Sequence, residues 1–379
     1  GAQTLLDFSP LTMLNRFYTY NTSSNLYNVV TPSLTTFAEA KGYLVRMPDT
    51  HPATATSWEG SFIGKPNSGN ISYTLVNDGA LKRFNAVGNP YPSPINAFDF
   101  VQNTNNNASI TGTLYFWRKT NNAASPSYST WTTAGFVNNG EDQVFDPNGV
   151  IQTGQGFIVE GKGDGSVEFT NAMRVNNHAN QFFRANNIVE RSRIWLNATN
   201  ADGLFSQTLV GYITDSNDGI DRADGKYMND GPIALTSIIN NTPYAIQGRS
   251  LPFDSNDIVP MQFKATTAGT YVIAIDHVDG LFTGDQNIYL RDAITGVDHN
   301  LKAGSYSFAS EAGTFDNRFS VVYTTSTLSI DTPILDANAI VVYKNANEAF
   351  EIHSGATTMA SVKIFDIRGR LLASLNNIN

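Results

Sequence analysis

The feature that most constrains this fold is the alternation of apolar and polar residues in short segments between turn sequences. Alternation is clear in residues 43–47 and 71–76, and turn sequences follow at residues 77–79 and 163–165. Side chains of a strand point alternately to two faces, so a period of two predicts half-buried strands. Short strands at this spacing are typical of sandwiches and barrels. The sequence therefore predicts an all-β protein.

The composition favours the same class. Charged residues make up only 15% of the chain, whereas ordinary soluble domains carry roughly 25%. Asn, Thr, Ser and Gly take their place, and these residues favour turns and strand surfaces over helices. Aromatic residues reach 11%, which argues against a disordered chain.

The charge and the absence of cysteine exclude several function classes. A net charge of −9 argues against nucleic acid and against an anionic membrane surface, because both need a basic footprint. With no cysteine, disulfides and thiolate chemistry are excluded. No apolar run approaches the roughly 18 residues of a membrane span, so we expect no membrane span.

Two changes of composition divide the chain. A polar stretch at residues 176–191 and a Ser/Thr/Asp-rich tether at residues 324–338 indicate linkers. We therefore predict two tandem β-sandwich domains, of jelly-roll or immunoglobulin-like kind, at residues 1–185 and 186–327. A small C-terminal β-sandwich is expected at residues 328–379.

The densest turn chemistry is the proline-rich loop at residues 88–94. Each proline fixes its own φ and restricts the residue before it, which predicts a rigid loop with Tyr91 packed inward. The functional alternative is a binding loop in which Tyr91 stacks on a ligand. One short helix is expected at residues 93–100.

Four tryptophans raise the question of a sugar-stacking platform. Trp117 and Trp195 lie in apolar runs and are predicted to be buried. Trp58 and Trp131 lie in polar segments, so they are the better candidates for contact with a ligand at the surface.

An acidic loop at residues 215–225 is a candidate calcium site. Asp215, Asn217, Asp221 and Asp224 would supply the oxygen ligands that Ca²⁺ prefers. The spacing departs from the EF-hand pattern, and the alternative is a solvent-facing Asx-turn connection between strands. Apart from this calcium, no cofactor is predicted.

The sequence lacks the common catalytic motifs, and we predict no enzymatic activity. The sequence has no Gly-x-Ser-x-Gly elbow, no phosphate loop and no His-Glu-x-x-His pattern, and its five histidines are scattered. A paired-carboxylate glycosidase is the strongest enzymatic alternative, and it would need two carboxylates about 5 to 10 Å apart across a cleft.

The last alternating segment carries the most specific pattern in the chain. Val362 and Ile364 belong to a half-buried strand, and Asp366, Gly369 and Arg370 form an Asp-x-x-Gly-Arg turn before a second strand. With residues 340–352, this segment resembles the type A C-terminal sorting domain of proteins exported by the type IX (Por) secretion system of Gram-negative bacteria. The usual turn proline is missing here, and by comparison with that family the domain is expected to be incomplete.

Upstream segments resemble a β-rich module that precedes this sorting domain in many large type IX surface proteins. The order of the segments is more telling than any one of them. They are residues 40–44, 88–93, 112–117, 154–159 and 169–174.

The resemblance implies a destination and partners. It implies a cargo protein at the outer-membrane surface or outside the cell, with the translocon and outer-membrane shuttle proteins as partners. The expected role is structural and adhesive, with a protein, glycan or substratum as ligand, during gliding motility or biofilm formation. The alternative is a carbohydrate-binding accessory region of a secreted hydrolase.

Overall fold

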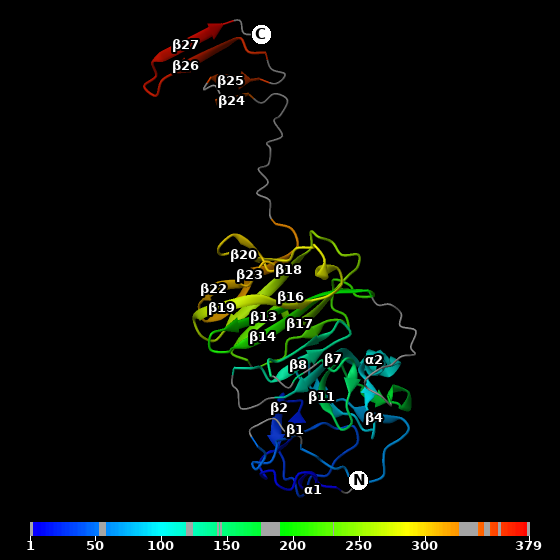
Figure 1. The fold of residues 1–379 in the computed structure, drawn as a ribbon. Helices are drawn as coiled ribbons and strands as arrows, with labels where there is room; N and C mark the ends of the chain where they lie inside the picture. The colour runs from blue at the N-terminus through cyan, green and yellow to red at the C-terminus, as the bar shows by residue number, and fades with distance from the viewer. Residues whose placement is uncertain are drawn as a thin grey trace. The chain divides into compact units, whose positions relative to one another are not determined.

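The computed structural model describes residues 3–52, 58–118, 124–141, 144, 146–175, 190–229, 231–325, 340–344, 349–354 and 358–376. Strands dominate it, and the prediction of an all-β protein is confirmed (Figure 1). The chain divides into two compact units, Gly1–Thr325 and Ser326–Asn379. No helix in the described residues is long and apolar enough to cross a membrane.

The first part of the larger unit is built from antiparallel strands. Two sheets have the orders β2-β1-β3 and β5-β11-β7-β8-β9, and two further pairs are β10-β6 and β12-β4. The strands are β1 (Phe17–Asn21), β2 (Leu26–Val29), β3 (Tyr43–Val45), β4 (Ile71–Thr74), β5 (Phe84–Gly88), β6 (Ile95–Asn96), β7 (Ile110–Trp117), β8 (Tyr128–Trp131), β9 (Phe136–Val137), β10 (Val150–Ile151), β11 (Gly156–Gly161) and β12 (Ser166–Phe169).

The three short α-helices in the described residues are each capped by an Asn or Thr side chain. The predicted helix is present as α2 (Ala97–Gln102), and Asn96 accepts a hydrogen bond from the backbone N–H of Asp99 at 3.1 Å. A further helix, α3 (Thr104–Ser109), follows and is capped in the same way by Asn103. The remaining helices are α1 (Leu5–Phe8) and two 3-10 turns, η1 (Asn171–Met173) and η2 (Gly280–Thr283).

The second part of this unit is one rolled sheet. Its order is β21-β20-β23-β18-β16-β17-β14-β13-β19-β22, with β15 paired to β17. The strands are β13 (Arg191–Asn200), β14 (Phe205–Ile213), β15 (Gly225–Lys226), β16 (Ile233–Ile239), β17 (Thr242–Arg249), β18 (Ile258–Ala265), β19 (Gly269–Val278), β20 (Tyr289–Asp292), β21 (Val297–Asn300), β22 (Tyr306–Ser310) and β23 (Gly313–Val322).

Side chains link the two ends of the rolled sheet. Arg318 on β23 donates to the carbonyl oxygen of Ala309 on β22 at 2.9 Å. The Tyr306 hydroxyl on β22 donates to Asp292 on β20 at 3.0 Å. Inward side chains from most of these strands meet in one hydrophobic core. The sheet is therefore nearly closed, like a barrel.

The two parts of the larger unit share a buried interface. The Thr113 hydroxyl on β7 donates to the carbonyl oxygen of Asp224 at 3.0 Å, and the Thr132 hydroxyl donates to that of Ala223 at 2.8 Å. The interface also has an apolar cluster, formed by Ala134, Val137, Trp195, Leu209, Ile213, Ala223 and Ile246. The two β regions predicted as tandem domains thus pack together in one compact unit. The boundary expected after residue 185 lies outside the described residues.

The smaller unit contains two antiparallel hairpins. One pairs β24 (Val341–Lys344) with β25 (Phe350–His353), and the other pairs β26 (Ser361–Phe365) with β27 (Leu371–Asn376). Most of the expected tether at residues 324–338 lies outside the described residues.

Candidate functional site

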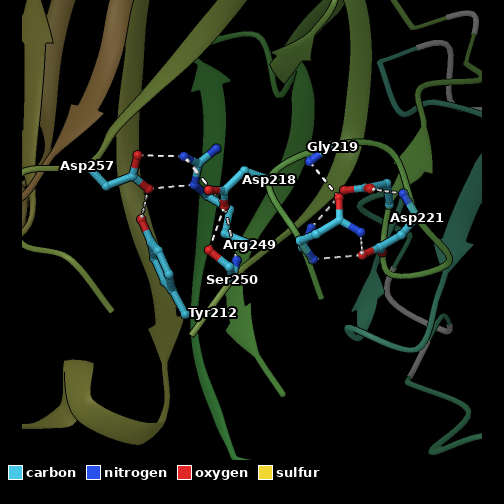
Figure 2. A network of polar contacts seen from close by, with 10 residues as sticks. Tyr212, Asp218, Gly219, Asp221, Arg249, Ser250 and Asp257 are labelled. Atoms are coloured by element: carbon cyan, nitrogen blue, oxygen red, sulfur yellow. Dashed lines mark hydrogen bonds and ion pairs between the residues drawn. The ribbon is translucent and has the colours of Figure 1, made fainter. Parts of the chain in front are cut away.

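The residues predicted to bind calcium lie in the acidic loop, which follows β14 and reaches the first residue of β15. Asp215 is exposed and has a φ of 66°. Asn217 accepts a hydrogen bond from the backbone N–H of Gly219 at 2.7 Å (Figure 2). The loop therefore begins with a turn that is closed by its own amide side chain.

The two carboxylates at the end of the loop are occupied in the same way. One Asp221 oxygen accepts from the backbone N–H of Asn217 at 2.9 Å, and the other accepts from that of Ala223 at 2.7 Å. Asp224 accepts from the backbone N–H of Asp221 at 2.7 Å and from that of Gly248 at 2.9 Å. The bonds to Asp224 satisfy one half-buried and one buried N–H group.

The geometry does not support the calcium prediction. In the part of the chain that the structure describes, no three His, Asp or Glu side chains are grouped to hold a metal ion. The oxygens of Asn217, Asp221 and Asp224 point at backbone donors, which is the Asx-turn arrangement weighed as the alternative. These hydrogen bonds fix the conformation of the loop between β14 and β15.

A second set of charges ties the acidic loop to β17. Arg249 donates two hydrogen bonds to Asp257, each at 2.5 Å, and the Tyr212 hydroxyl donates to the same carboxylate at 2.6 Å (Figure 2). Asp218 accepts from the backbone N–H of Ser250 at 3.1 Å, and this bond lowers the pKa of Asp218. A bidentate Arg–carboxylate pair of this kind fixes both side chains, so the network is structural.

Asp224 gives this loop a pH dependence. Its side chain is buried, and burial raises the pKa of Asp224 to about 7, despite the two N–H donors that favour the charged form. A raised folded pKa means that the folded state binds a proton between the ordinary value of 3.8 and about pH 7. As the pH rises through that range, the free energy of unfolding should therefore fall, by at most about 1.4 kcal/mol per pH unit from this group.

We predict that Asp224→Asn reduces this slope. Urea unfolding at several pH values between 4.5 and 7.5 measures it, with the exposed Asp285→Asn as the control variant. The slope should be smaller in Asp224→Asn than in the wild type and the control. Equal slopes in all three proteins would contradict the assignment.

The aromatic candidates are mostly buried. Trp131 is 2% exposed and packs edge-on against Phe98, with ring centroids 5.0 Å apart, so the prediction that it lies at the surface is wrong. Tyr91 is also 2% exposed, and its hydroxyl donates to the carbonyl oxygen of Gly69 at 2.6 Å. This confirms the inward orientation of Tyr91. Trp58 is half-buried, and its ring centroid lies 5.4 Å from that of Phe8. Neither Tyr91 nor Trp131 offers a ring face to a ligand.

The C-terminal turn is held by Asp366. One of its carboxylate oxygens accepts from the backbone N–H groups of Arg368 and Arg370, at 3.0 and 2.9 Å. The other accepts from the Arg370 guanidinium at 3.2 Å, and Gly369 has a φ of 77°. Each fixed position of the Asp-x-x-Gly-Arg pattern therefore has a role: the acid accepts, the glycine turns and the arginine donates.

The strands beside this turn expose their apolar side chains. Val362 is half-buried, Ile364 is more exposed, and Ile367 in the turn is fully exposed. Other exposed apolar side chains on this hairpin are Phe365, Leu371, Leu372 and Leu375. The hairpin is therefore an apolar surface as well as a turn.

Comparisons with known proteins place the chain in a family. Residues 1–323 match a family described as Domain of unknown function (DUF8693). The chain belongs to the DUF8693 family. Residues 328–379 match a second family, described as Domain of unknown function (DUF8694). Neither a curated protein nor a solved structure matches the chain.

The DUF8693 region coincides with the larger compact unit. The match ends at residue 323, and the unit ends at Thr325. It spans both β regions that the sequence predicted as separate domains. Family and structure thus agree in treating residues 1–323 as one region.

Sequence reasoning missed a polar pocket in this DUF8693 member. It lies beside β1 and β2, has a volume of about 290 Å³, and is lined by Thr19, Tyr20, Asn21, Thr22, Ser23, Asn28, Lys41, Tyr73, Val76 and Ala86. These residues come from separate segments of the first 90 positions, and they form no motif. The one available signal was polar side chains on strands β1 and β2, which alternation alone assigns to solvent.

Proposed function

We propose that this chain is a cargo of the type IX secretion system, displayed on the cell surface or released, with an adhesive or structural role. Residues 326–379 carry the address that the translocon and the outer-membrane shuttle proteins recognise. The larger unit is the part presented outside the cell, where it contacts a protein, a glycan or a substratum. No catalytic step belongs to this proposal.

The observation that carries the proposal is the self-contained turn at Asp366. Its hydrogen bonds come from Arg368 and Arg370 within the same turn, so its shape depends on no neighbouring element. Residues 326–379 also form a compact unit distinct from the larger one. An export signal must be accessible and must keep its shape when presented to a receptor, and this turn meets both requirements.

The hairpin beside the turn offers a mode of recognition. Within the described residues, β26 and β27 pair only with each other, so each strand has one unpaired edge. An unpaired edge is a template for strand addition by a partner, and alternate side chains then supply specificity. The exposed Leu371 and Leu375 would fill pockets in such a partner.

Replacing Gly369 with valine and Arg370 with alanine in the full-length protein should abolish surface display. A β-branched residue at a φ of 77° is strained by about 1–2 kcal/mol, and the second change removes the donor to Asp366. Display is measured by antibody labelling of intact cells that have a type IX system, beside the total amount of protein.

Gly296→Val is the matched control. Gly296 has a φ of 71°, lies in a turn of the larger unit, and has no atom near an added Cβ, as is also true of Gly369. It should strain a turn to the same degree without changing display. Normal display of the double variant, or equal loss in both variants, would refute the role of the Asp366 turn.

A further inference from the structure

The polar pocket beside β1 combines several side chains that converge from separate segments. Thr19, Tyr20 and Asn21 come from β1, Asn28 from the exposed edge strand β2, and Tyr73 from β4. Its volume of about 290 Å³ lies just below the roughly 300–1,000 Å³ of ligand pockets. The pocket suits a small ligand or a single unit of a longer one.

Some polar side chains that line the pocket hydrogen-bond to other residues of the chain, and others make no such bond to the described residues. The Thr22 hydroxyl donates to the carbonyl oxygen of Phe84 at 2.6 Å, and the Tyr20 hydroxyl donates to Asn25 at 3.3 Å. By contrast, the side chains of Thr19, Asn28 and Tyr73 make no hydrogen bond to any residue that the structure describes. These free groups include two hydroxyls and an amide, so the pocket offers both donors and acceptors.

The charge of the pocket is opposite to that of the chain. Lys41 is the one charged residue among its lining residues, and no carboxylate accompanies it. Lys41 forms no ion pair with the described residues, although its ammonium lies 5.5 Å from the centre of the Tyr43 ring. A lysine with no carboxylate beside it in the pocket attracts an anion there, although the whole chain carries a net charge of −9.

Two tyrosines complete the lining. Tyr20 and Tyr73 are half-buried, and burial raises the pKa of each hydroxyl, so both remain protonated donors at neutral pH. Their rings supply apolar surface next to polar tips. Sugar rings have the complementary chemistry, with apolar C–H faces and hydroxyls at their rims.

We propose that this pocket binds one unit of an acidic glycan, with Lys41 pairing with the carboxylate of a uronic acid. The hydroxyl of Thr19 and the amide of Asn28 then bond to the sugar hydroxyls. Phosphate is a poorer match, because its sites often gather arginines, and no arginine is among the lining residues. The proposal does not depend on type IX export, since it concerns binding by the purified chain.

The test is calorimetric titration of the purified full chain with uronic-acid oligosaccharides. The probes are oligomers of galacturonate, of mannuronate and guluronate, and of hyaluronan, each beside its methyl ester. The ester keeps the ring and hydroxyls but removes the charge. We expect saturable binding to at least one acid, weakened by esterification and by added salt.

Variants locate the binding. Lys41→Met and Asn28→Ala should each weaken binding at least about tenfold. Each removes a side chain that the proposal places in a polar contact with the sugar, and the loss of such a contact commonly has an effect of this size. Lys82→Met removes an exposed lysine outside the pocket lining and should change nothing. All three variants should melt like the wild type. Absence of saturable binding to every acid, or binding unaffected by Lys41→Met and Asn28→Ala, would overturn the proposal.

Discussion

Replacing Arg318 with methionine should lower the free energy of unfolding by about 3–5 kcal/mol, because it leaves a buried carboxylate without its partner. Asp292 is 0% exposed and Arg318 is 8% exposed, and their closest atoms are 3.0 Å apart. The pair joins β20 to β23 in the rolled sheet. Among the described residues, few charged side chains are buried to this degree.

The surroundings of Arg318 make the pair hard to replace. Its guanidinium lies 4.7 Å from the ring centres of both Phe308 and Phe319, and it also donates to the carbonyl oxygen of Ala309. Arg318 therefore links β23 to both β20 and β22. Methionine retains part of the apolar contact but none of these hydrogen bonds.

Urea unfolding measures the effect, and two further variants interpret it. Arg291→Met removes a neighbouring pair with Asp298 whose arginine is 30% exposed, and it should cost no more than about 1 kcal/mol. Arg318→Met combined with Asp292→Leu should recover much of the loss, because no charge then remains buried. A loss below about 1 kcal/mol in Arg318→Met would show that the pair does not close the sheet.

The cost of Arg318→Met should also depend on pH. Burial alone would raise the pKa of Asp292, but hydrogen bonds from Arg318, the backbone N–H of Ile294 and Tyr306 hold it below its ordinary value of 3.8. A lowered folded pKa contributes stability above about pH 4, and this contribution is lost as the pH falls through the folded value. The difference between wild type and Arg318→Met should therefore shrink in acid.

Period-two alternation predicted the strands because a sheet with one buried face requires it. The expected strand at residues 71–76 contains β4, and that at residues 43–47 contains β3. Alternation could not predict that β14 pairs in parallel with β17, or that the sheet rolls until Arg318 reaches β22. Those features depend on contacts between residues far apart in the sequence.

The surface prediction for Trp131 failed for a physical reason. Its polar neighbours were interpreted as solvent-facing, but Ser129 and Thr132 are buried and donate to the carbonyl oxygens of Phe116 and Ala223. Hydroxyls satisfied in this way carry little cost of burial. Polar neighbours in the sequence therefore predict exposure only where their side chains find no backbone group to hydrogen-bond within the fold.

The acidic loop shows the same limit of composition. Calcium loops and Asx turns use the same Asp and Asn residues, and they differ in what the oxygens face. Here the backbone N–H groups of Ala223 and Gly248 donate to the carboxylate oxygens of the loop. Gly248 lies on β17, so the local sequence of the loop could not predict this partner. By contrast, the turn at Asp366 was predicted correctly, because all of its bonds are local.

Trp195→Ala should lower the free energy of unfolding by about 3–5 kcal/mol and loosen the interface between the two β regions. Trp195 is buried on β13, and its indole N–H donates to the carbonyl oxygen of Phe136 on β9 at 2.7 Å. Its ring is stacked with His277 at 3.9 Å and lies 4.6 Å from the Arg193 guanidinium. Alanine removes a large apolar contact and a hydrogen bond across the interface at once.

Amide hydrogen exchange separates one cooperative unit from two tandem domains. If the regions unfold together, exchange in β8 and β9 should become faster in Trp195→Ala, although the substitution is on β13. Phe319→Ala is the matched control, because Phe319 is equally buried in the core of the rolled sheet, away from the interface cluster. If the regions unfold as one unit, Phe319→Ala should also speed exchange in β8 and β9, and if they are tandem domains it should leave exchange there unchanged. Unchanged exchange in these strands in Trp195→Ala would favour tandem domains, since independent domains transmit no loss of stability across their contact.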